Sequence, residues 1–337
     1  MRKPIKVILY ITIAAILAFG LASCRPAAET PAAAPAEEAS AEEARDITIA
    51  TITYSNEIEW FFILDQNYRD VAAELGIELV QVDAEMDPQT QVDLIEQMTQ
   101  RGVDAILISP VDPQVIRAAV QDALDAGIIV LIQGQERETV PWSTANFGYD
   151  EAQMGTLTGE IAAAGVKDKF PDATELKVAV LGDPGWASSV IRMDGAKQAL
   201  MDNLPGVDID FVLDHVLGVT IETATNVIES ALQQHPDLRT VVGINDDAAI
   251  GAVGAMQSAG IDISEACIAG AGNNRGTWPY IDRGEILGSV DLNHRGTAEV
   301  AINAVVSLLD GEEVPEMMYI DMIKVTPENL DNWYTGE

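Results

Sequence analysis

The chain has 337 residues, 48% of them hydrophobic, with 19 basic residues against 54 acidic ones and a formal net charge of −35. A surface this acidic repels phosphate backbones and anionic headgroups, which argues against nucleic acid as a partner. The length suffices for two ordinary domains. Its cysteines, Cys24 and Cys267, provide no disulfide framework, and we expect Cys267, which lies in an apolar run, to be a buried core residue.

The first 24 residues predict an export signal. A basic start (residues 1–6) leads into an uncharged apolar run of 15 residues (7–21), which ends in Leu21-Ala22-Ser23-Cys24. This order is typical of a secretory signal peptide, and the run is shorter than the roughly 20 residues that span a bilayer. An uncleaved anchor is the alternative. The closing tetrapeptide resembles the bacterial lipobox, which implies that residues 1–23 are removed and that Cys24 is lipidated.

Residues 24–45 then predict a lipidated cysteine followed by a disordered tether. Positions 25–45 hold nine Ala, five Glu and three Pro, with no aromatic or aliphatic β-branched residue. Such a segment cannot bury enough apolar surface to offset its ordering entropy. We therefore expect the remaining chain to lie outside the cytoplasm, in the periplasm or at the outer face of the cell membrane, with a lipid anchor as its sole attachment to the membrane.

Apolar, β-branched segments bounded by turns recur along that remaining chain and predict nine strands. In chain order they are residues 47–53, 77–83, 105–109, 128–133, 177–181, 209–213, 241–245, 268–271 and 286–292. Between most of them, apolar residues recur at spacings of three and four, which indicates amphipathic helices. Several of these helices reach a glycine before the next strand, as at Gly76, Gly102, Gly127 and Gly260.

Strands that are apolar throughout are buried on both faces, which is typical of parallel sheets covered by helices. The alternation pauses at residues 134–150, a polar stretch without a clear period, and then resumes. Nine strands with their helices exceed one ordinary core, so we predict an α/β protein of two doubly wound parallel-sheet lobes. In such sheets a ligand binds beyond the carboxyl ends of the strands, here in the cleft between the lobes.

The sequence offers no catalytic constellation, and we predict neither an enzyme nor a cofactor or metal site. His215, His235 and His294 are far apart and lack ligand spacing, so we expect surface or capping roles for them. Paired acids such as Asp246 and Asp247 are typical either of helix starts or of solvated charges. No nucleophile elbow, phosphate loop or paired-cysteine motif occurs.

Aromatic and hydrogen-bonding side chains follow the predicted strands in both halves of the chain. Aromatic faces stack on sugar rings, while amides, Arg and Asp bond ring hydroxyls. The structural alternative is that the amides form turns and that Trp60 or Phe61 belongs to the core. Because the pattern repeats at strand ends, we predict a ligand site made of Tyr54, Asn56, Trp60, Phe61, Gln133, Gln135, Trp186, Arg192, Asn245, Asn273, Asp291 and Asn293.

Four segments carry a resemblance to a known family. They are Leu75-Gly76, residues 97–110 (QMTQRGVDAILISP), residues 126–130 (AGIIV) and residues 242–252 (VGINDDAAIGA). With them, residues 46–325 resemble the type I periplasmic sugar-binding proteins of the ribose/galactose group, whose fold the core of lac-repressor-type regulators shares. The resemblance implies three crossings between the lobes, near residues 147–150, 292–294 and 319–322. The first lobe would then comprise 46–147 plus 293–321, and the second 148–292 plus 322–337.

The resemblance also implies roles for particular residues. Trp60 and Phe61 match the paired aromatics that sandwich the sugar, Arg192 falls at the sugar-binding arginine, and Asn245 matches a ligand amide. Other anchors differ. The Asp-Arg pair of ribose-type members reads Gly134-Gln135 here, their Phe-Asp reads Ala271-Gly272, and Leu292 stands at the place of a hinge glutamine. We therefore expect a small neutral hydroxyl-rich ligand and do not assign ribose, galactose or glucose.

Three functions follow as hypotheses. The first is a monomeric solute receptor whose lobes close on the ligand and deliver it to the transmembrane permease of an ABC importer. The alternative is a sensory receptor of the same fold that binds an autoinducer-like furanose or polyol for a membrane kinase or chemoreceptor. A third is an extracytoplasmic glycosidase, which needs paired carboxylates in one cleft, such as Asp291 with Asp183 or Asp246.

Overall fold

The computed structural model describes residues 46–333, apart from the side chain of Glu59. The predicted signal peptide, Cys24 and the tether lie outside these residues. From Asp46 onward the chain forms one compact unit. Within the described range, no helix has both the length and the apolar character needed to cross a membrane.

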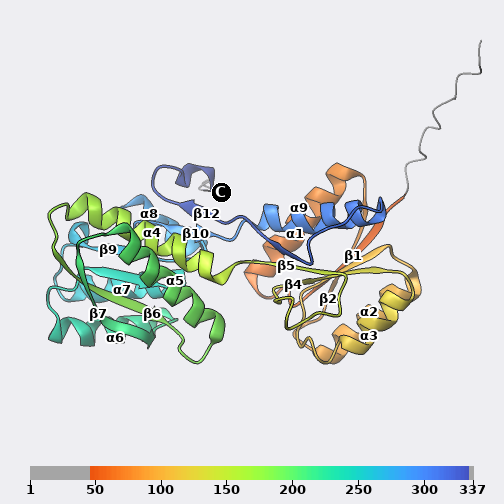
Figure 1. Cartoon of the computed structure of the whole chain (residues 1–337), viewed down its shortest axis with the longest axis horizontal. Helices are drawn as coiled ribbons and strands as arrows, with labels where there is room; N and C mark the ends of the chain where they lie inside the picture. The colour runs from red at the N-terminus through yellow and green to blue at the C-terminus, as the bar shows by residue number, and fades with distance from the viewer. Residues whose placement is uncertain (1–45, 334–337) are drawn as a thin grey trace, which may run out of the picture. The chain divides into compact units, whose positions relative to one another are not determined.

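The first lobe is built on a six-stranded parallel sheet in the order β11-β5-β4-β3-β1-β2 (Figure 1). Its strands are β1 (Thr48–Thr53), β2 (Glu78–Asp83), β3 (Ala105–Ile108), β4 (Ile129–Gln133), β5 (Ala145–Gly148) and β11 (Met317–Tyr319). Its helices are α1 (Glu59–Leu75), α2 (Pro88–Arg101), α3 (Arg117–Asp125) and α9 (His294–Leu309).

The second lobe has a four-stranded parallel sheet in the order β7-β6-β8-β9, with a separate antiparallel pair, β10 and β12. Its strands are β6 (Glu175–Gly182), β7 (Asp208–Leu217), β8 (Thr240–Gly243), β9 (Cys267–Ala269), β10 (Ser289–Asp291) and β12 (Ile323–Val325). Its helices are α4 (Glu151–Lys169), α5 (Ala187–Asn203), α6 (Ile221–Gln234), α7 (Asp246–Ser258) and α8 (Trp278–Asp282), with short 3-10 turns at η1 (Ile263–Glu265), η2 (Arg275–Thr277) and η3 (Leu330–Asn332).

Each sheet is buried on both faces, as the continuous apolar strands predict. In the first lobe, α1 and α9 enclose one core that contains Leu64, Phe147 and Ile302, and α2 and α3 enclose another around Ile95 and Ile106 (Figure 1). In the second lobe, α6 and α7 cover one face of the sheet and α4 and α5 cover the other. The doubly wound fold is therefore confirmed.

Glycine ends several helices for a conformational reason. At Gly76 and Gly102 the backbone turns into the left-handed region, with φ of 70° and 73°, where a Cβ is disfavoured. Both residues also donate their N–H to carbonyls of the last helical turn. The predicted burial of Cys267 is likewise confirmed, because its side chain is fully buried in the core under α4 and α5.

Three short segments connect the two lobes, at residues 149–150, 292–293 and 320–322. The first leads from β5 to α4, the second from β10 to α9, and the third from β11 to β12. These connections are the three-strand hinge of the predicted fold class.

Sequence patterning missed three short strands. β5 lies inside the polar stretch that has no clear period, and β11 and β12 have only three residues each. β5 and β11 are held by parallel pairing at the edge of the first-lobe sheet, and β12 by antiparallel pairing with β10. Tertiary pairing therefore makes these segments strands.

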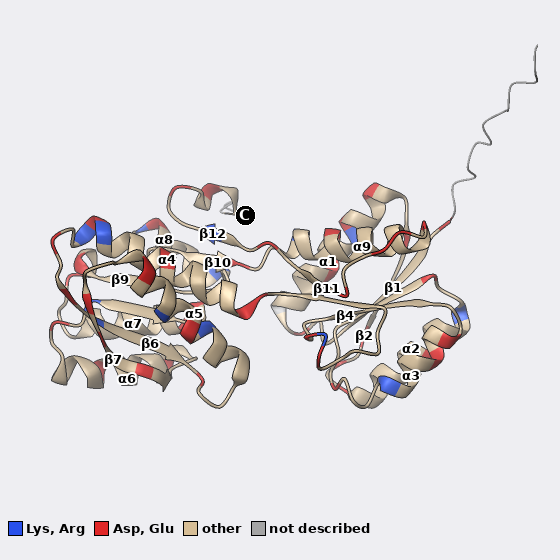
Figure 2. Cartoon of the chain, viewed as in Figure 1, with Lys and Arg blue, Asp and Glu red and all other residues tan. Residues whose placement is uncertain are grey.

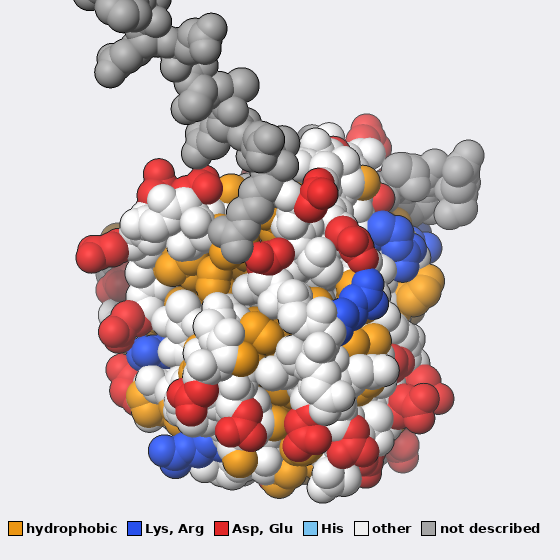
Figure 3. All heavy atoms as spheres, turned by 90° about the vertical axis from the view of Figure 1, so that its right-hand side faces the viewer, with side chains coloured by type: hydrophobic (Ala, Val, Ile, Leu, Met, Phe, Trp, Pro, Cys, Tyr) orange, Lys and Arg blue, Asp and Glu red, His pale blue; other side chains and the backbone are white. Residues whose placement is uncertain are grey.

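Acidic residues are spread over both lobes and outnumber basic ones (Figure 2). The space-filling view of the first lobe shows isolated carboxylates among neutral side chains, with a few basic ones between them (Figure 3). No single element carries the excess negative charge, which fits a solvated acidic surface.

Candidate functional site

A cavity of ≈ 210 Å³ lies between elements of the two lobes. Trp60 and Ile63 of α1 and His294 of α9 line it from the first lobe. The second lobe contributes Gly272, Asn273, Asn274, Arg275, Trp278, Asp291 and Trp333. A larger hollow of ≈ 930 Å³ lies at the amino ends of β6, β7 and β8. Because ligands of doubly wound sheets bind at the carboxyl ends, the smaller cavity is the candidate site.

Trp60 sits at the centre of an aromatic cluster on the first lobe. It follows the turn after β1, as the second residue of α1, and its indole meets Phe61 edge-on at 4.9 Å and Tyr149 at 6.2 Å. The His294 ring lies 5.1 Å away. The indole Nε1 is buried and has no hydrogen-bond partner among the described residues. Because Nε1 is enclosed, the part of Trp60 that the cavity presents to a ligand is its aromatic ring.

Tyr54 and Phe61 belong to the same cluster, although neither lines the cavity. Their rings stack at 5.4 Å with an interplanar angle of 11°. Phe61 in turn supports the edge of Trp60. In this structure the pair therefore orients Trp60.

The second lobe presents its polar groups on a strained loop after β9. Gly272 has φ of 121° and Asn273 has φ of 51°, a conformation that hydrogen bonds must hold in place. The Asn273 N–H donates to Ser289 Oγ at 2.9 Å. The Asn273 side chain donates to Asp291 Oδ2 at 2.7 Å and accepts from Trp278 Nε1 at 2.9 Å. The amide of Asn273 is thus fixed by Trp278 and Asp291.

Asp246 of α7 holds this loop through hydrogen bonds. Its carboxylate accepts from Ser289 Oγ and from the Asn274 N–H, each at 2.6 Å. The residue lies in the first turn of α7, which confirms the helix-start alternative, and it is fully buried rather than solvated. Burial raises the pKa of Asp246 to about 6, and the hydrogen bonds from Ser289 and Asn274 oppose that rise.

Asp291 ends β10 and faces the cavity while also shaping the second connection between the lobes. Its Oδ2 accepts from Asn273, and its Oδ1 accepts from the Asn293 N–H at 2.6 Å. Asn293 has φ of 52° and caps α9 by accepting from the Gly296 N–H at 2.9 Å. A carboxylate has about four acceptor positions, so Asp291 retains capacity for ligand hydroxyls.

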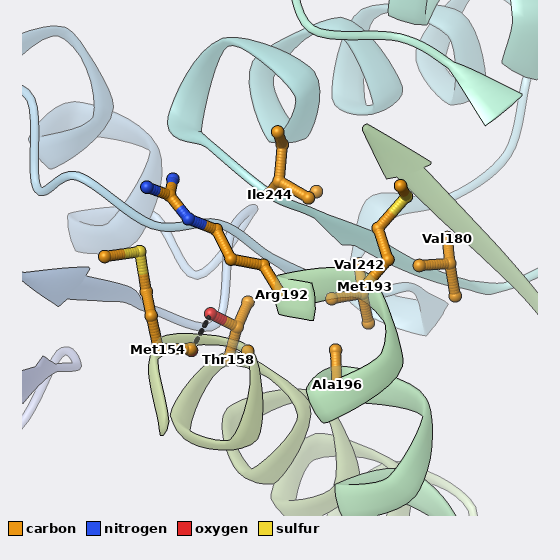
Figure 4. A pocket seen from close by; sticks show the side chains of 10 residues that line it. Met154, Thr158, Val180, Arg192, Met193, Ala196, Val242 and Ile244 are labelled. Carbon is orange, nitrogen blue, oxygen red and sulfur yellow. Dashed lines mark hydrogen bonds between the residues drawn. The ribbon is translucent and has the colours of Figure 1, made fainter. Parts of the chain in front are cut away.

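Arg192 lies outside the cavity lining. At Arg192, the backbone of α5 packs closely against α4. A Cβ atom at Gly155 of α4 would lie only 1.9 Å from the Arg192 carbonyl oxygen, so the contact requires glycine there. Its guanidinium forms an ion pair with Glu151 of α4 and stacks on Trp186 at 5.1 Å. Figure 4 shows its side chain extending away from the apolar residues Met193 and Ala196 of the same helix. Arg192, Met193 and Ala196 border a crevice of only ≈ 10 Å³, which is too small for a solute.

The other predicted site residues lie elsewhere along the strand ends, and several bond within their own lobe. Gln133 accepts from Ser109 Oγ, and the Gln135 carbonyl accepts from the Asn146 side chain. Asn245 caps α7 and donates to the Val219 carbonyl at 2.8 Å. The Asn56 N–H donates to Asp83 at 2.9 Å. The structure therefore brings Trp60, Asn273 and Asp291 together at one cavity.

Seven further lining residues were not among the predicted site residues: Ile63, Gly272, Asn274, Arg275, Trp278, His294 and Trp333. Trp278 follows β9 at a distance of nine residues, so extending the strand-end rule to the next helix would have found it. His294 was expected to be a surface or capping residue, yet it packs against Trp60. Only the tertiary fold brings Trp333 to the site.

Comparison with known proteins agrees with this architecture. The sequence model of the periplasmic binding protein domain matches residues 49–313. The chain belongs to this family. It is 29% identical over 318 residues to the ribose import binding protein of Bacillus subtilis (strain 168), which covers 93% of this chain and 95% of that protein. It is 27% identical to the D-ribose/D-allose-binding protein of Pseudomonas aeruginosa, across 68% of this chain and 70% of that one.

Solved structures extend the match to the fold. A periplasmic solute-binding protein of Actinobacillus succinogenes 130z with bound D-allose aligns with a TM-score of 0.69 at 25% identity, over 85% of this chain and 100% of that one. The resemblance to type I periplasmic sugar-binding proteins is thus confirmed in family and fold. The family implies an extracytoplasmic location, and its members are substrate-binding proteins. Among residues 46–333, no cluster of His, Cys, Asp and Glu could hold a metal ion.

Proposed function

We propose that the protein is a lipid-anchored, monomeric solute receptor that captures a small neutral hydroxyl-rich ligand, a sugar or a sugar-like cyclitol, and delivers it to an ABC importer. The observation that carries this proposal is the cavity itself, which Trp60 of the first lobe and Asn273 and Asp291 of the second lobe line together. The relatives named for ribose and allose support the sugar class.

The lining chemistry suits such a ligand. An indole face packs on the C–H face of a ring, while Asp291 accepts hydrogen bonds from its hydroxyls. A volume of ≈ 210 Å³ lies below the roughly 300–1,000 Å³ of pockets for drug-sized ligands, which suits a small ring ligand. Arg192, the predicted sugar-binding arginine, would have to leave Glu151 to reach a ligand.

Closure of the lobes would supply selectivity. A ligand shifts a hinge equilibrium by as much as it binds the closed form more tightly than the open one. A solute that touches Trp60 and Asp291 at once joins the lobes, so it favours closure. The permease would then recognise the closed form, and the predicted lipid at Cys24 would keep the receptor at the membrane.

The alternatives receive less support. The relatives include a ribose import protein and an ABC transporter protein, which favours transport over the sensory role. A glycosidase would need a second carboxylate beside Asp291, and Asp246 is one of the two candidates that the sequence suggested. Asp246 is fully buried under Ser289 and Asn274, so it cannot reach a glycosidic bond.

A thermal-melt screen tests the proposal. A ligand that binds only the folded protein raises its melting temperature by mass action. We expect a rise of several degrees with at least one of D-ribose, D-allose and myo-inositol, and none with amino acids or nucleosides. A rise with an amino acid alone, or no rise with any of the sugars or cyclitols, would contradict the proposed ligand class.

A further inference from the structure

Trp333, in the C-terminal segment, lines the candidate ligand cavity. The segment follows β12 and ends, in the described range, with η3 and Trp333. It lies beyond residue 313, where the match to the family model stops. No role for it therefore follows from the family match.

The segment is fixed to the part of the second lobe that carries the ligand-facing groups. β12 pairs with β10, placing Ile323 opposite Asp291. Leu330 is only 3% exposed and is buried in the core under α6 and α7. Asn329 ties the turn together, accepting from the Thr326 N–H at 2.8 Å and donating to the Lys324 carbonyl at 2.9 Å. Trp333 is thus held at a defined place.

Trp333 is half-buried. It packs against the same core as Leu330, alongside the partly buried Trp278, and both indoles also line the cavity. Trp278 donates its Nε1 to Asn273, so it borders the polar groups of the site. A wall of two indoles beside the Asn273 and Asp291 side chains matches a ring that has a C–H face and a hydroxyl edge.

We propose that Trp333 forms an aromatic wall of the ligand site, so that the C-terminal segment selects ring ligands with an apolar face, such as pyranoses and cyclitols. This inference rests on the proposed function. It assigns to residues 326–333 a direct part in recognition, in addition to their part in the fold.

The test compares variants of the full chain, purified in mild detergent. Dissociation constants are measured by calorimetry with D-ribose, D-allose and myo-inositol, together with ligand-free melting temperatures. We expect Trp333→Ala and Trp333→Leu to weaken binding about tenfold, as is usual when one aromatic stacking surface is lost. Trp333→Phe should retain affinity within about threefold, because a phenyl ring preserves the stacking face.

Trp333→Leu separates recognition from folding, because leucine keeps apolar packing against the core without an aromatic face. Trp142→Phe, in the first lobe and outside the cavity, is the control for loss of an indole. Wild-type affinity in the Leu variant, or a lower melting temperature with unchanged affinity, would overturn the inference and leave the proposed function intact. Absence of binding by the wild type to all three probes would overturn both.

Discussion

The two lobes contribute different chemistry to the cavity. The first lobe supplies an aromatic cluster around Trp60, whose Nε1 has no partner among the described residues. The second lobe supplies Asn273 and Asp291, which are already bonded to each other and linked through Ser289 to the buried Asp246. The polar side of the cavity, formed by Asn273 and Asp291, is therefore organised before a ligand binds, which lowers the entropic cost of binding. The aromatic side, formed by Trp60, has no such hydrogen-bond network within residues 46–333.

Removing Asp291 from the polar side of the cavity should have the largest effect on affinity. Asp291→Ala deletes an acceptor that is bonded to Asn273 and to the Asn293 N–H. A hydrogen bond to a charged group contributes about 1.5–3 kcal/mol, so we expect the dissociation constant for the best ligand of the melt screen to rise roughly 10- to 150-fold. Calorimetry measures it directly.

Asp321→Asn is the matched control for this prediction. Asp321 lies at the third connection between the lobes, and its backbone carbonyl, not its carboxylate, accepts from Asn293. Affinity should be unchanged in this variant. Equal losses in Asp291→Ala and Asp321→Asn would indicate a general effect of charge near the hinge, and would contradict a local acceptor role.

Removing Trp60 from the aromatic side of the cavity should have a somewhat smaller effect. Trp60→Ala deletes a stacking surface, which by comparison with base–aromatic stacking costs about 1–3 kcal/mol of binding free energy. Trp142→Ala, outside the cavity, should lower ligand-free stability while leaving affinity unchanged. If Trp60→Ala unfolds the protein without ligand, the reading of Trp60 as a core residue was correct.

The buried Asp246 should make the unfolding free energy of the protein depend on pH. Its pKa is raised to about 6, so the native state binds a proton that the unfolded state has released above pH 3.8. The contribution of Asp246 to the unfolding free energy is therefore fully present below pH 3.8 and is lost as the pH rises through about 6. From pH 4 to 7.5, we expect the wild type to lose about 2 kcal/mol of unfolding free energy relative to Asp246→Asn, at 1.36 kcal/mol per pKa unit.

Urea unfolding of both proteins across this pH range measures the difference. Asp65 also has a pKa raised to about 6 by burial, but it is present in both proteins, so its contribution cancels. A difference that stays constant with pH would contradict the account of Asp246.

The ion pair of Arg192 should have the smallest effect. Glu151 competes with any ligand for this guanidinium, and partly exposed ion pairs contribute about 0.2–1 kcal/mol. If Arg192 also reaches the ligand, Glu151→Gln should tighten binding up to about fivefold. The gain should vanish in an Arg192→Ala background. Tightening that persists without Arg192 would exclude this arginine from the ligand site.

Most of the fold could be predicted because its signals are local. Nine apolar segments become strands, and glycines such as Gly76 and Gly102 end helices where the backbone turns left-handed. β5, β11 and β12 could not be found in this way, because segments of three or four residues give a weak local signal and become strands through pairing with distant neighbours.

The ligand site was less predictable, because it too depends on contacts between residues that are distant in the sequence. Trp60 and Asn273 lie a few residues after β1 and β9, and Asp291 ends β10, so a local rule selects all three. The same rule selects Gln133 and Asn245, whose amides bond within their own lobe. Trp333 reaches the cavity only because β12 pairs with β10 and Leu330 is buried. Sequence position thus identifies candidates, and long-range packing decides which of them meet.

A crystal structure with the ligand that gives the largest melting shift tests the central claim most directly. We predict a single ring bound between the lobes, stacked on Trp60 and bonded through its hydroxyls to Asp291. A ligand bound instead in the hollow at the amino ends of β6, β7 and β8, or one that contacts a single lobe, would contradict the account.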